Sequence, residues 1–296
     1  MSSGNEGPAE SVPAQSVLVD PSELGRVGGR PGLLKYFKQL WNYRSFIIFD
    51  SRSRIASGNA QDFLGQFWLI LNPLLNGATY FFVFGLLLGT GRGVENFISY
   101  LIVGVFMFRF TSSAVLAGSR AISSNKQIVR AFHFPRATLP IAVNVRELMT
   151  QIPAFITMLV LIMLIPPHAE IGWTWFLFIP VLALQLLFNL GLSFFLARLV
   201  DRWNDIANLV SFGTRIWMYL SCVFYSVDRF AQHDTIMAIM QANPMFCVLD
   251  IARDSLVYGQ LPSANSWMVL TLWTVGALII GFLFFWQAEE TYGQEK

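Results

Sequence analysis

The segment WMVLTLWTVGALIIGFLFFW, residues 267–286, decides the fold class of this chain. It contains no charged side chain, and a helix of about 20 apolar residues is long enough to cross the hydrocarbon core of a bilayer. Five other segments of about this length are nearly free of charge and also rich in apolar residues, near residues 66–88, 97–117, 140–165, 175–199 and 206–227. The sequence therefore predicts an all-α integral membrane protein with six transmembrane helices.

The composition of the whole chain agrees with this prediction. Of 296 residues, 54% are hydrophobic, 15% are aromatic and only 13% are charged, which excludes an ordinary water-soluble protein. The net charge of +2 is too small to favour nucleic acid as a partner. Residues 1–30 have no apolar core, so we expect a disordered cytoplasmic tail and no signal peptide.

Two other segments have helical periodicity without being spans. In residues 31–62, apolar side chains recur at helical spacing from Leu33 to Ile48, which predicts an amphipathic helix at the membrane surface that ends near Phe49 in a polar hinge. Residues 63–290 then form the membrane domain, and 291–296 a cytoplasmic C-terminus. Within that domain, residues 228–262 carry too much charge to span and predict two short re-entrant or surface helices.

Lysine and arginine flank the spans unevenly, which predicts the orientation. With six spans, only Arg92, Arg229 and Arg253 are expected on one side of the membrane. Cytoplasmic loops carry the excess of positive residues, so both termini are expected in the cytoplasm of a bacterial plasma membrane protein. The residues on the basic side are Lys35, Lys38, Arg44, Arg52, Arg54, Arg120, Lys126, Arg130, Arg136, Arg198 and Arg202.

The motifs that the chain lacks narrow its chemistry. It has no GxxxxGK[ST] motif, so we expect ATP to be used by a separate partner. The spans contain no Asp or Glu except Glu147, which disfavours ion-driven transport. Acidic and His residues in the loops lack catalytic spacing, and Cys222 and Cys247 lack metal-ligand spacing. We therefore predict no catalytic residue, no metal site and no cofactor bound by this chain.

A series of motifs runs along the chain in a fixed order: FLGQFW (63–68), LNPLL (71–75), SSNKQIVR (123–130), FPR (134–136), RWNDI (202–206), YLSCVFY (219–225) and NPM (243–245) with Arg253. Taken together, they resemble the membrane subunit of ABC exporters of lipid-linked polysaccharides, the Wzm-type permeases that work with a separate Wzt-type ATPase. Two features depart from the family pattern: Cys222 stands where proline is common, and residues 51–61 form a longer stretch than usual. The aromatic spans without acidic residues and the long tail most resemble the mycobacterial-type galactan exporter.

The resemblance implies a function and an assembly. A homodimer with two Wzt-type ATPase subunits, which use ATP and Mg²⁺, would move a polyprenyl-linked glycan of O-antigen, teichoic acid or galactan type to the outer face of the membrane. A single six-span bundle has little room for a polymer, which also favours the dimer. Two alternatives stay open: an ABC exporter of small hydrophobic drugs, and a membrane enzyme that uses polyprenyl phosphate.

The resemblance also makes residues 118–138 a cytoplasmic coupling loop that contacts the ATPase. Without it, a basic turn bound to anionic headgroups is the simpler reading. Ile128, Val129 and Phe132 could fill a cleft in the ATPase, while Asp50, Arg52 and Arg54 are either surface charges or a second contact. The predicted coupling residues are Asp50, Arg52, Asn125, Lys126, Val129, Arg130, Phe132, Phe134, Pro135 and Arg136.

Arg109 and Arg215 lie inside predicted spans, where a charge costs at least roughly 2.5 kcal/mol. They either hold substrate phosphates, which guanidinium groups match, or satisfy carbonyls at subunit contacts, or, for Arg109, reach out to the membrane surface. Most aromatic residues are expected to face lipid, and a few to stack on sugars in the channel. The predicted channel residues are Phe67, Trp68, Phe81, Arg109, Arg215, Trp217 and Tyr219.

Overall fold

The computed structural model describes residues 32–58, 67–80, 82–83, 87, 94, 96–132, 134–166, 168–169, 171–227 and 232–292. Every regular element in these ranges is a helix. Among them, four helices are long and apolar enough to cross a membrane, or up to five if one bent pair counts as a span. The all-α membrane fold is confirmed, while the predicted number of six spans stays a prediction.

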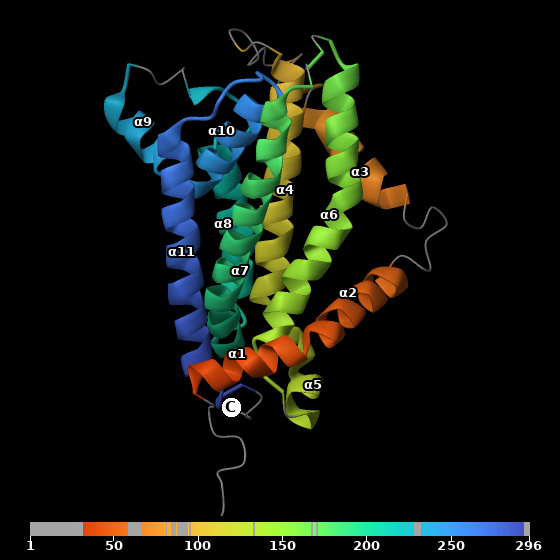
Figure 1. Cartoon of the computed structure of the whole chain (residues 1–296), viewed down its shortest axis with the longest axis vertical. Helices are drawn as coiled ribbons and strands as arrows, with labels where there is room; N and C mark the ends of the chain where they lie inside the picture. The colour runs from red at the N-terminus through yellow and green to blue at the C-terminus, as the bar shows by residue number, and fades with distance from the viewer. Residues whose placement is uncertain are drawn as a thin grey trace, which may run out of the picture.

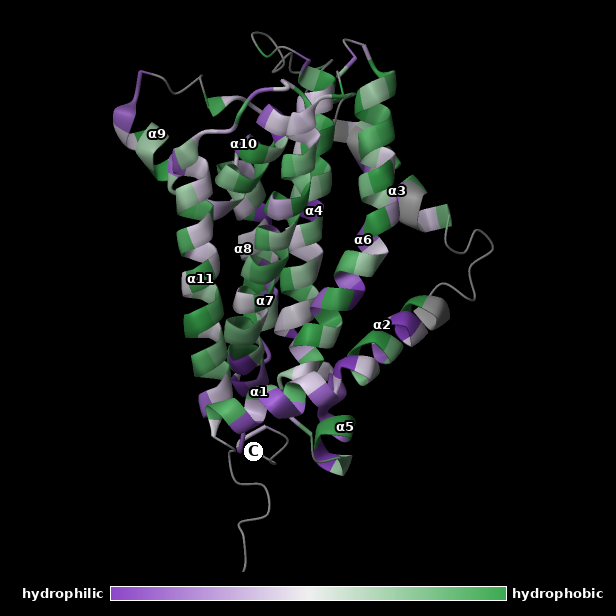
Figure 2. Ribbon diagram, viewed as in Figure 1, coloured by the Kyte–Doolittle hydropathy of each residue, from purple (hydrophilic) through white to green (hydrophobic). Residues whose placement is uncertain are grey.

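Four long helices form the body of the molecule (Figure 1). They are α4 (Phe97–Ser119), α6 (Thr138–Leu164), α7 (Phe178–Arg202) and α11 (Ala264–Gln287), and they match four predicted spans to within a few residues. In α4, 72% of the apolar window is buried inside the protein, against 22% in α11. The helix α4 is therefore the axis of the bundle, and α11 leaves most of its apolar surface for lipid (Figure 2).

Polar side chains fasten α4 to its neighbours inside the apolar body. The Gln185 side-chain amide of α7 donates to the carbonyl oxygen of Met107 and to the Thr111 hydroxyl, both at 2.8 Å. The Gln151 amide of α6 donates to the carbonyl oxygen of Phe106 at 3.3 Å. Without water to compete, such bonds between helices fix which faces meet, a task that apolar contacts alone do poorly in lipid.

Helix α3 (Trp68–Tyr80) lies in the predicted first span, whose remaining residues fall mostly outside the described ranges. Helix α8 (Ile206–Leu220) lies in the predicted fifth span and has 15 residues, fewer than the roughly 20 of a straight span. The expected continuation of α8 to Val227 is wrong, because the chain turns at Cys222, whose φ is +54°. The Tyr100 hydroxyl donates to the Cys222 and Tyr225 carbonyl oxygens, at 3.0 and 2.7 Å, so this break needs no proline.

Between α8 and α11, the structure has two short helices, as predicted. Helices α9 (Asp234–Gln241) and α10 (Pro244–Leu256) are bent by 84° relative to each other. Asn243 causes the bend: its side chain accepts from the Met245 N–H at 3.0 Å and so caps α10, while Pro244 has no N–H to extend α9. Helix α10 is largely buried and packs against α4, α7 and α11.

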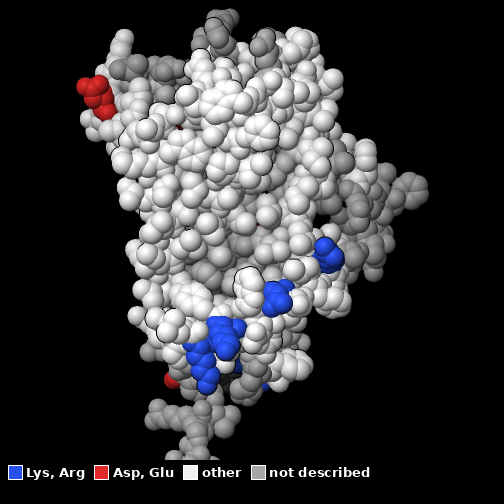
Figure 3. Space-filling view, viewed as in Figure 1, with Lys and Arg blue, Asp and Glu red and all other residues white. Residues whose placement is uncertain are grey.

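The predicted surface helix is two helices, α1 (Leu33–Asn42) and α2 (Arg44–Gly58), which cross one end of the bundle (Figure 1). Its predicted end near Phe49 is wrong. The polar residues beyond it stay helical because Asp50 pairs with Arg54 at 2.9 Å, and because the Ser51 hydroxyl donates to the carbonyl oxygens of Ile47 and Ala142. Lys and Arg gather at this end (Figure 3).

Two glycines allow α7 and α11 to touch along their backbones. A Cβ atom on Gly281 would lie 2.1 Å from the carbonyl oxygen of Gly191, and a Cβ on Gly191 would lie 2.5 Å from the carbonyl carbon of Ala277. Both distances are far below contact, and the groups in the way are backbone atoms that cannot rotate aside. Small residues at such crossings are the usual means of close helix packing in membranes.

We expect Gly281→Ala to push α7 and α11 apart and to lower the melting temperature of the detergent-purified protein by at least about 3 °C. Gly276→Ala is the matched control, because it lies on the same helix with open space around its Cβ position. Size-exclusion chromatography after heating measures both. Equal melting temperatures for the two variants would contradict the close contact.

Candidate functional site

The predicted coupling loop contains two short helical elements, η3 (Ser123–Asn125) and α5 (Lys126–Ala131), at the basic end of the molecule. Its Asn125 is buried, and the Asn125 amide donates to the carbonyl oxygen of Ala121 at 2.8 Å. The Arg54 guanidinium of α2 donates to the Asn125 side-chain oxygen at 2.9 Å. The loop is therefore tied directly to the surface helix.

The structure divides the predicted coupling residues into an outer and an inner set. Lys126, Arg130 and Phe132 are exposed, and 64% of Phe132 faces outward although it is apolar. Val129 is 1% exposed and packs into the chain's own core. The outer residues form part of the protein surface, whereas the inner ones hold the loop in place. Asn125 and Pro135 are also inner, Arg52 is outer, and Asp50, Phe134 and Arg136 are half-buried.

Phe134 and Arg136 connect the loop to the surface helices. The Phe134 ring lies 6.3 Å from the Tyr43 ring and 6.4 Å from the Phe46 ring, centroid to centroid. The Arg136 guanidinium lies over the Phe134 ring, 5.1 Å from its centroid. These predicted coupling residues therefore touch the chain itself, and they stiffen the junction between the loop, α1 and α2.

A half-buried carboxylate joins the loop to both ends of the described chain. Glu289, just after α11, accepts from the Tyr36 hydroxyl at 2.8 Å and from the Arg136 backbone N–H at 2.7 Å. The Tyr36 hydroxyl accepts in turn from the Ala137 N–H at 3.1 Å. Burial raises the pKa of the Glu289 carboxyl and lowers that of the Arg136 guanidinium. Sequence reasoning missed Tyr36 and Glu289, because nothing in the local pattern pairs residues so far apart.

We expect Tyr36→Phe to lower the melting temperature in detergent by about 2–6 °C, because it leaves Glu289 and the Ala137 N–H each without one buried partner. Tyr43→Phe, seven residues further along, is the control that removes a hydroxyl of the same kind outside this cluster. Tryptophan fluorescence during heating provides the measurement. Indistinguishable melting curves would show that the cluster contributes nothing to stability.

Two of the predicted channel residues, Arg109 and Arg215, meet in one cavity of about 280 Å³ between α3, α4 and α8. Arg109 is half-buried in the middle of α4, and Arg215 is exposed on α8. Two guanidinium groups with hydroxyl and amide neighbours form an environment suited to an anion with several oxygens. The polar residues that complete the wall are Asn76, Ser112, Ser113 and Thr214.

The aromatic channel candidates that the structure describes lie in different surroundings. Trp217 points inward, where its indole N–H donates to the Asn243 side-chain oxygen at 2.9 Å and its ring packs edge-on against Phe108 and Phe188. Tyr219 is 52% exposed on α8, and its ring lies 5.5 Å from that of Phe224. Phe67 is exposed and Trp68 is half-buried at the start of α3, and Phe81 lies outside the described residues.

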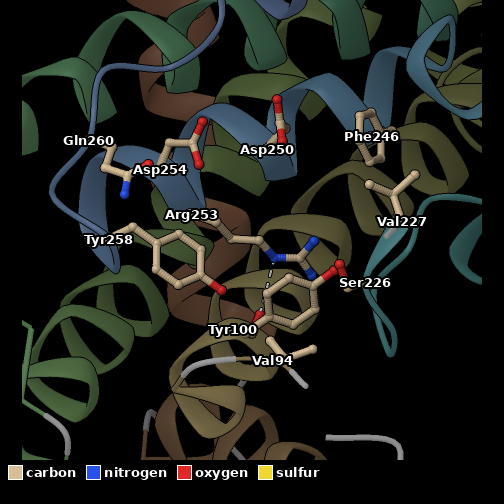
Figure 4. A pocket seen from close by; sticks show the side chains of 10 residues that line it. All are labelled: Val94, Tyr100, Ser226, Val227, Phe246, Asp250, Arg253, Asp254, Tyr258 and Gln260. Atoms are coloured by element: carbon tan, nitrogen blue, oxygen red, sulfur yellow. Dashed lines mark hydrogen bonds between the residues drawn. The ribbon is translucent and has the colours of Figure 1, made fainter. Parts of the chain in front are cut away.

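A second cavity, of about 360 Å³, lies at the end of the bundle opposite α1 (Figure 4). Asp250, Arg253 and Asp254 of α10 line it together with Tyr100 of α4. Sequence reasoning used these charges only to argue that residues 228–262 do not span. Their spacing of three and four residues, which places them on one side of a helix, was the signal that could have identified a site.

Comparison with known proteins gives consistent matches. Residues 55–257 match the family model of ABC-2 type transporters. The chain is 26% identical over 238 residues to the O-antigen export system permease protein RfbA of Myxococcus xanthus, covering 80% of this chain and 90% of that protein. It is also 26% identical over 202 residues to the RfbA permease of Klebsiella pneumoniae, covering 67% and 74% of the two chains.

Proposed function

Because the chain belongs to the ABC-2 type transporter family, we propose that it is the membrane subunit of an ATP-driven exporter of polyprenyl-linked polysaccharide. It is a multi-pass protein of the bacterial inner membrane. The observation that carries the proposal is its likeness to O-antigen export permeases along most of both chains. Two copies would assemble with two Wzt-type ATPase subunits, and the glycan would be of O-antigen, teichoic acid or galactan type.

The basic end supports a place for the ATPase. Cytoplasmic segments carry the excess of Lys and Arg, so α1, α2 and the coupling loop would face the cytoplasm (Figure 3). Lys126, Arg130 and the exposed Phe132 would contact the partner, which uses ATP and Mg²⁺. Because Glu289 and Arg54 bind the loop to α11, α1 and α2, a push on Phe132 would move these elements as one body.

The cavity with two arginines supports a substrate that carries phosphate. A polyprenyl-linked glycan has a diphosphate between the lipid and the first sugar, and guanidinium groups bind phosphate oxygens in pairs. Arg109 and Arg215 would hold this group as it passes between α4 and α8. A small hydrophobic drug has no anionic group for these two guanidinium groups to bind, so the cavity favours a substrate that carries phosphate over drug export.

The first experiment is to purify the protein with the products of its neighbouring genes in mild detergent. We expect an ATPase to co-purify and its ATP hydrolysis to increase when lipid-linked glycan is added. Stimulation only by small hydrophobic compounds would instead establish drug export. Repeated absence of any ATPase would overturn the proposal in favour of a membrane enzyme that uses polyprenyl phosphate.

We expect Phe132→Ala to uncouple glycan transport by this subunit from ATP hydrolysis by its partner. Removing an exposed aromatic anchor should reduce glycan-stimulated ATP hydrolysis about tenfold at normal expression and melting temperature. Val129→Ala is the matched comparison, since Val129 is buried three residues earlier in the same loop. It should lower the melting temperature and leave coupling intact in the protein that folds. Normal stimulation in Phe132→Ala would exclude this contact.

We expect Arg109→Gln and Arg215→Gln each to raise the concentration of lipid-linked glycan needed for half-maximal ATPase stimulation about tenfold. For Arg215→Lys this concentration should lie between those of the wild type and Arg215→Gln, because lysine keeps the positive charge but cannot donate two parallel hydrogen bonds to a phosphate. The control is Arg146→Gln, which removes an α6 arginine that does not line the cavity. A shift in Arg146→Gln as large as in the other variants would refute phosphate binding in this cavity.

A further inference from the structure

The cavity at the end opposite α1 has a wall built around one buried charge. Arg253 is 4% exposed, and its guanidinium donates to the carbonyl oxygens of Tyr100 at 3.3 Å and Val223 at 3.2 Å. It also stacks on the Tyr100 ring, 3.4 Å from the centroid (Figure 4). A Cβ atom on Gly104 would come within 2.5 Å of this guanidinium. Arg253 is therefore committed to the protein and is not a mobile anchor for an anion.

The remaining charges of the cavity are negative. Asp250 and Asp254, one turn apart on α10, both line it, and one oxygen of Asp250 accepts from the Ser266 hydroxyl at 2.6 Å. Arg253, which lies between them in the sequence, is already committed to backbone carbonyl groups. Carboxyl groups disfavour a phosphate group beside them, and they accept hydrogen bonds well from hydroxyl groups.

The other lining groups suit a ligand with many hydroxyls. Tyr258 and Gln260 offer a phenol and an amide, each able to donate and accept, and Ser226 lies on the opposite wall (Figure 4). Phe246 and the Tyr258 ring add apolar faces, which the C–H groups of a sugar ring can cover. The volume of about 360 Å³ lies within the range of small-molecule sites.

We propose that this cavity binds a neutral sugar unit of the exported glycan. This inference rests on the proposed function for the origin of its ligand, but its chemistry is independent of any ATPase. The two cavities then have opposite preferences. The one with Arg109 and Arg215 takes the phosphate group, and the one with Asp250 and Asp254 takes uncharged sugar and rejects phosphate.

The test is saturation-transfer NMR on the purified full-length protein in detergent. The probes are the methyl glycosides of galactose, mannose and rhamnose, with glucose 1-phosphate as the charged comparison. We expect at least one neutral glycoside to bind and the phosphate ester to bind at least about tenfold more weakly. Absence of binding by all three neutral glycosides, or equal binding of the phosphate ester, would overturn the proposal.

Variants of Asp254 test whether the glycoside binds in this cavity. Asp254→Ala and the nearly isosteric Asp254→Asn should each weaken glycoside binding about tenfold at an unchanged melting temperature. Asp234→Asn, an exposed acid on α9 outside the cavity, is the control and should bind as wild type does. Wild-type binding in both Asp254 variants would refute the site.

The outcomes separate this site from the exporter function. Glycan-stimulated ATP hydrolysis by a complex that binds no glycoside would refute the cavity as a sugar site and leave the proposed export intact. Glycoside binding that depends on Asp254, in a protein without any ATPase partner, would support the site and refute ATP-driven export.

Discussion

Tyr100 and Arg253 satisfy the backbone where the helical body is broken, and the end of the molecule around α9 and α10 depends on them. A chain that leaves a helix inside a membrane protein must find internal partners for its carbonyl groups, since lipid offers none. Tyr100 binds the carbonyls of Cys222 and Tyr225, and Arg253 binds those of Val223 and Tyr100. The turn after α8 and the burial of α10 follow from these four bonds.

At the other end, one half-buried acid has a comparable role. Glu289 is shared by α1, through Tyr36, and by the loop before α6, through the Arg136 backbone. One carboxylate therefore ties the first and last described helices to the loop between α4 and α6. The two ends of the bundle therefore differ. At one end, side chains bind the backbone carbonyl groups where the helix is interrupted, and at the other, a carboxylate binds the surface helix α1 and the loop before α6.

The sequence predicted what depends on composition over a long window. The spans that became α4, α6, α7 and α11 were predicted to within a few residues, because about 20 apolar residues have few alternatives. It also predicted the helix pair α9–α10 and the two arginines that share a cavity. The predictions failed where side chains distant in the sequence determine the local structure. The turn at Cys222 is stabilised by a hydrogen bond from Tyr100, and the extension of α2 by a hydrogen bond from Ser51 to α6. The role of Glu289 was missed because its partner, Tyr36, lies at the other end of the described chain.

The contact between Gly191 and Gly281 limits how this subunit can deform. With the carbonyl oxygen of one glycine seated where the other has no side chain, sliding α7 along α11 would drive the side chains next in register into the opposite backbone. Shear between these two helices is therefore blocked. If the subunit rearranges, contacts between other helices, such as those around α3 and α8, are the ones that must change.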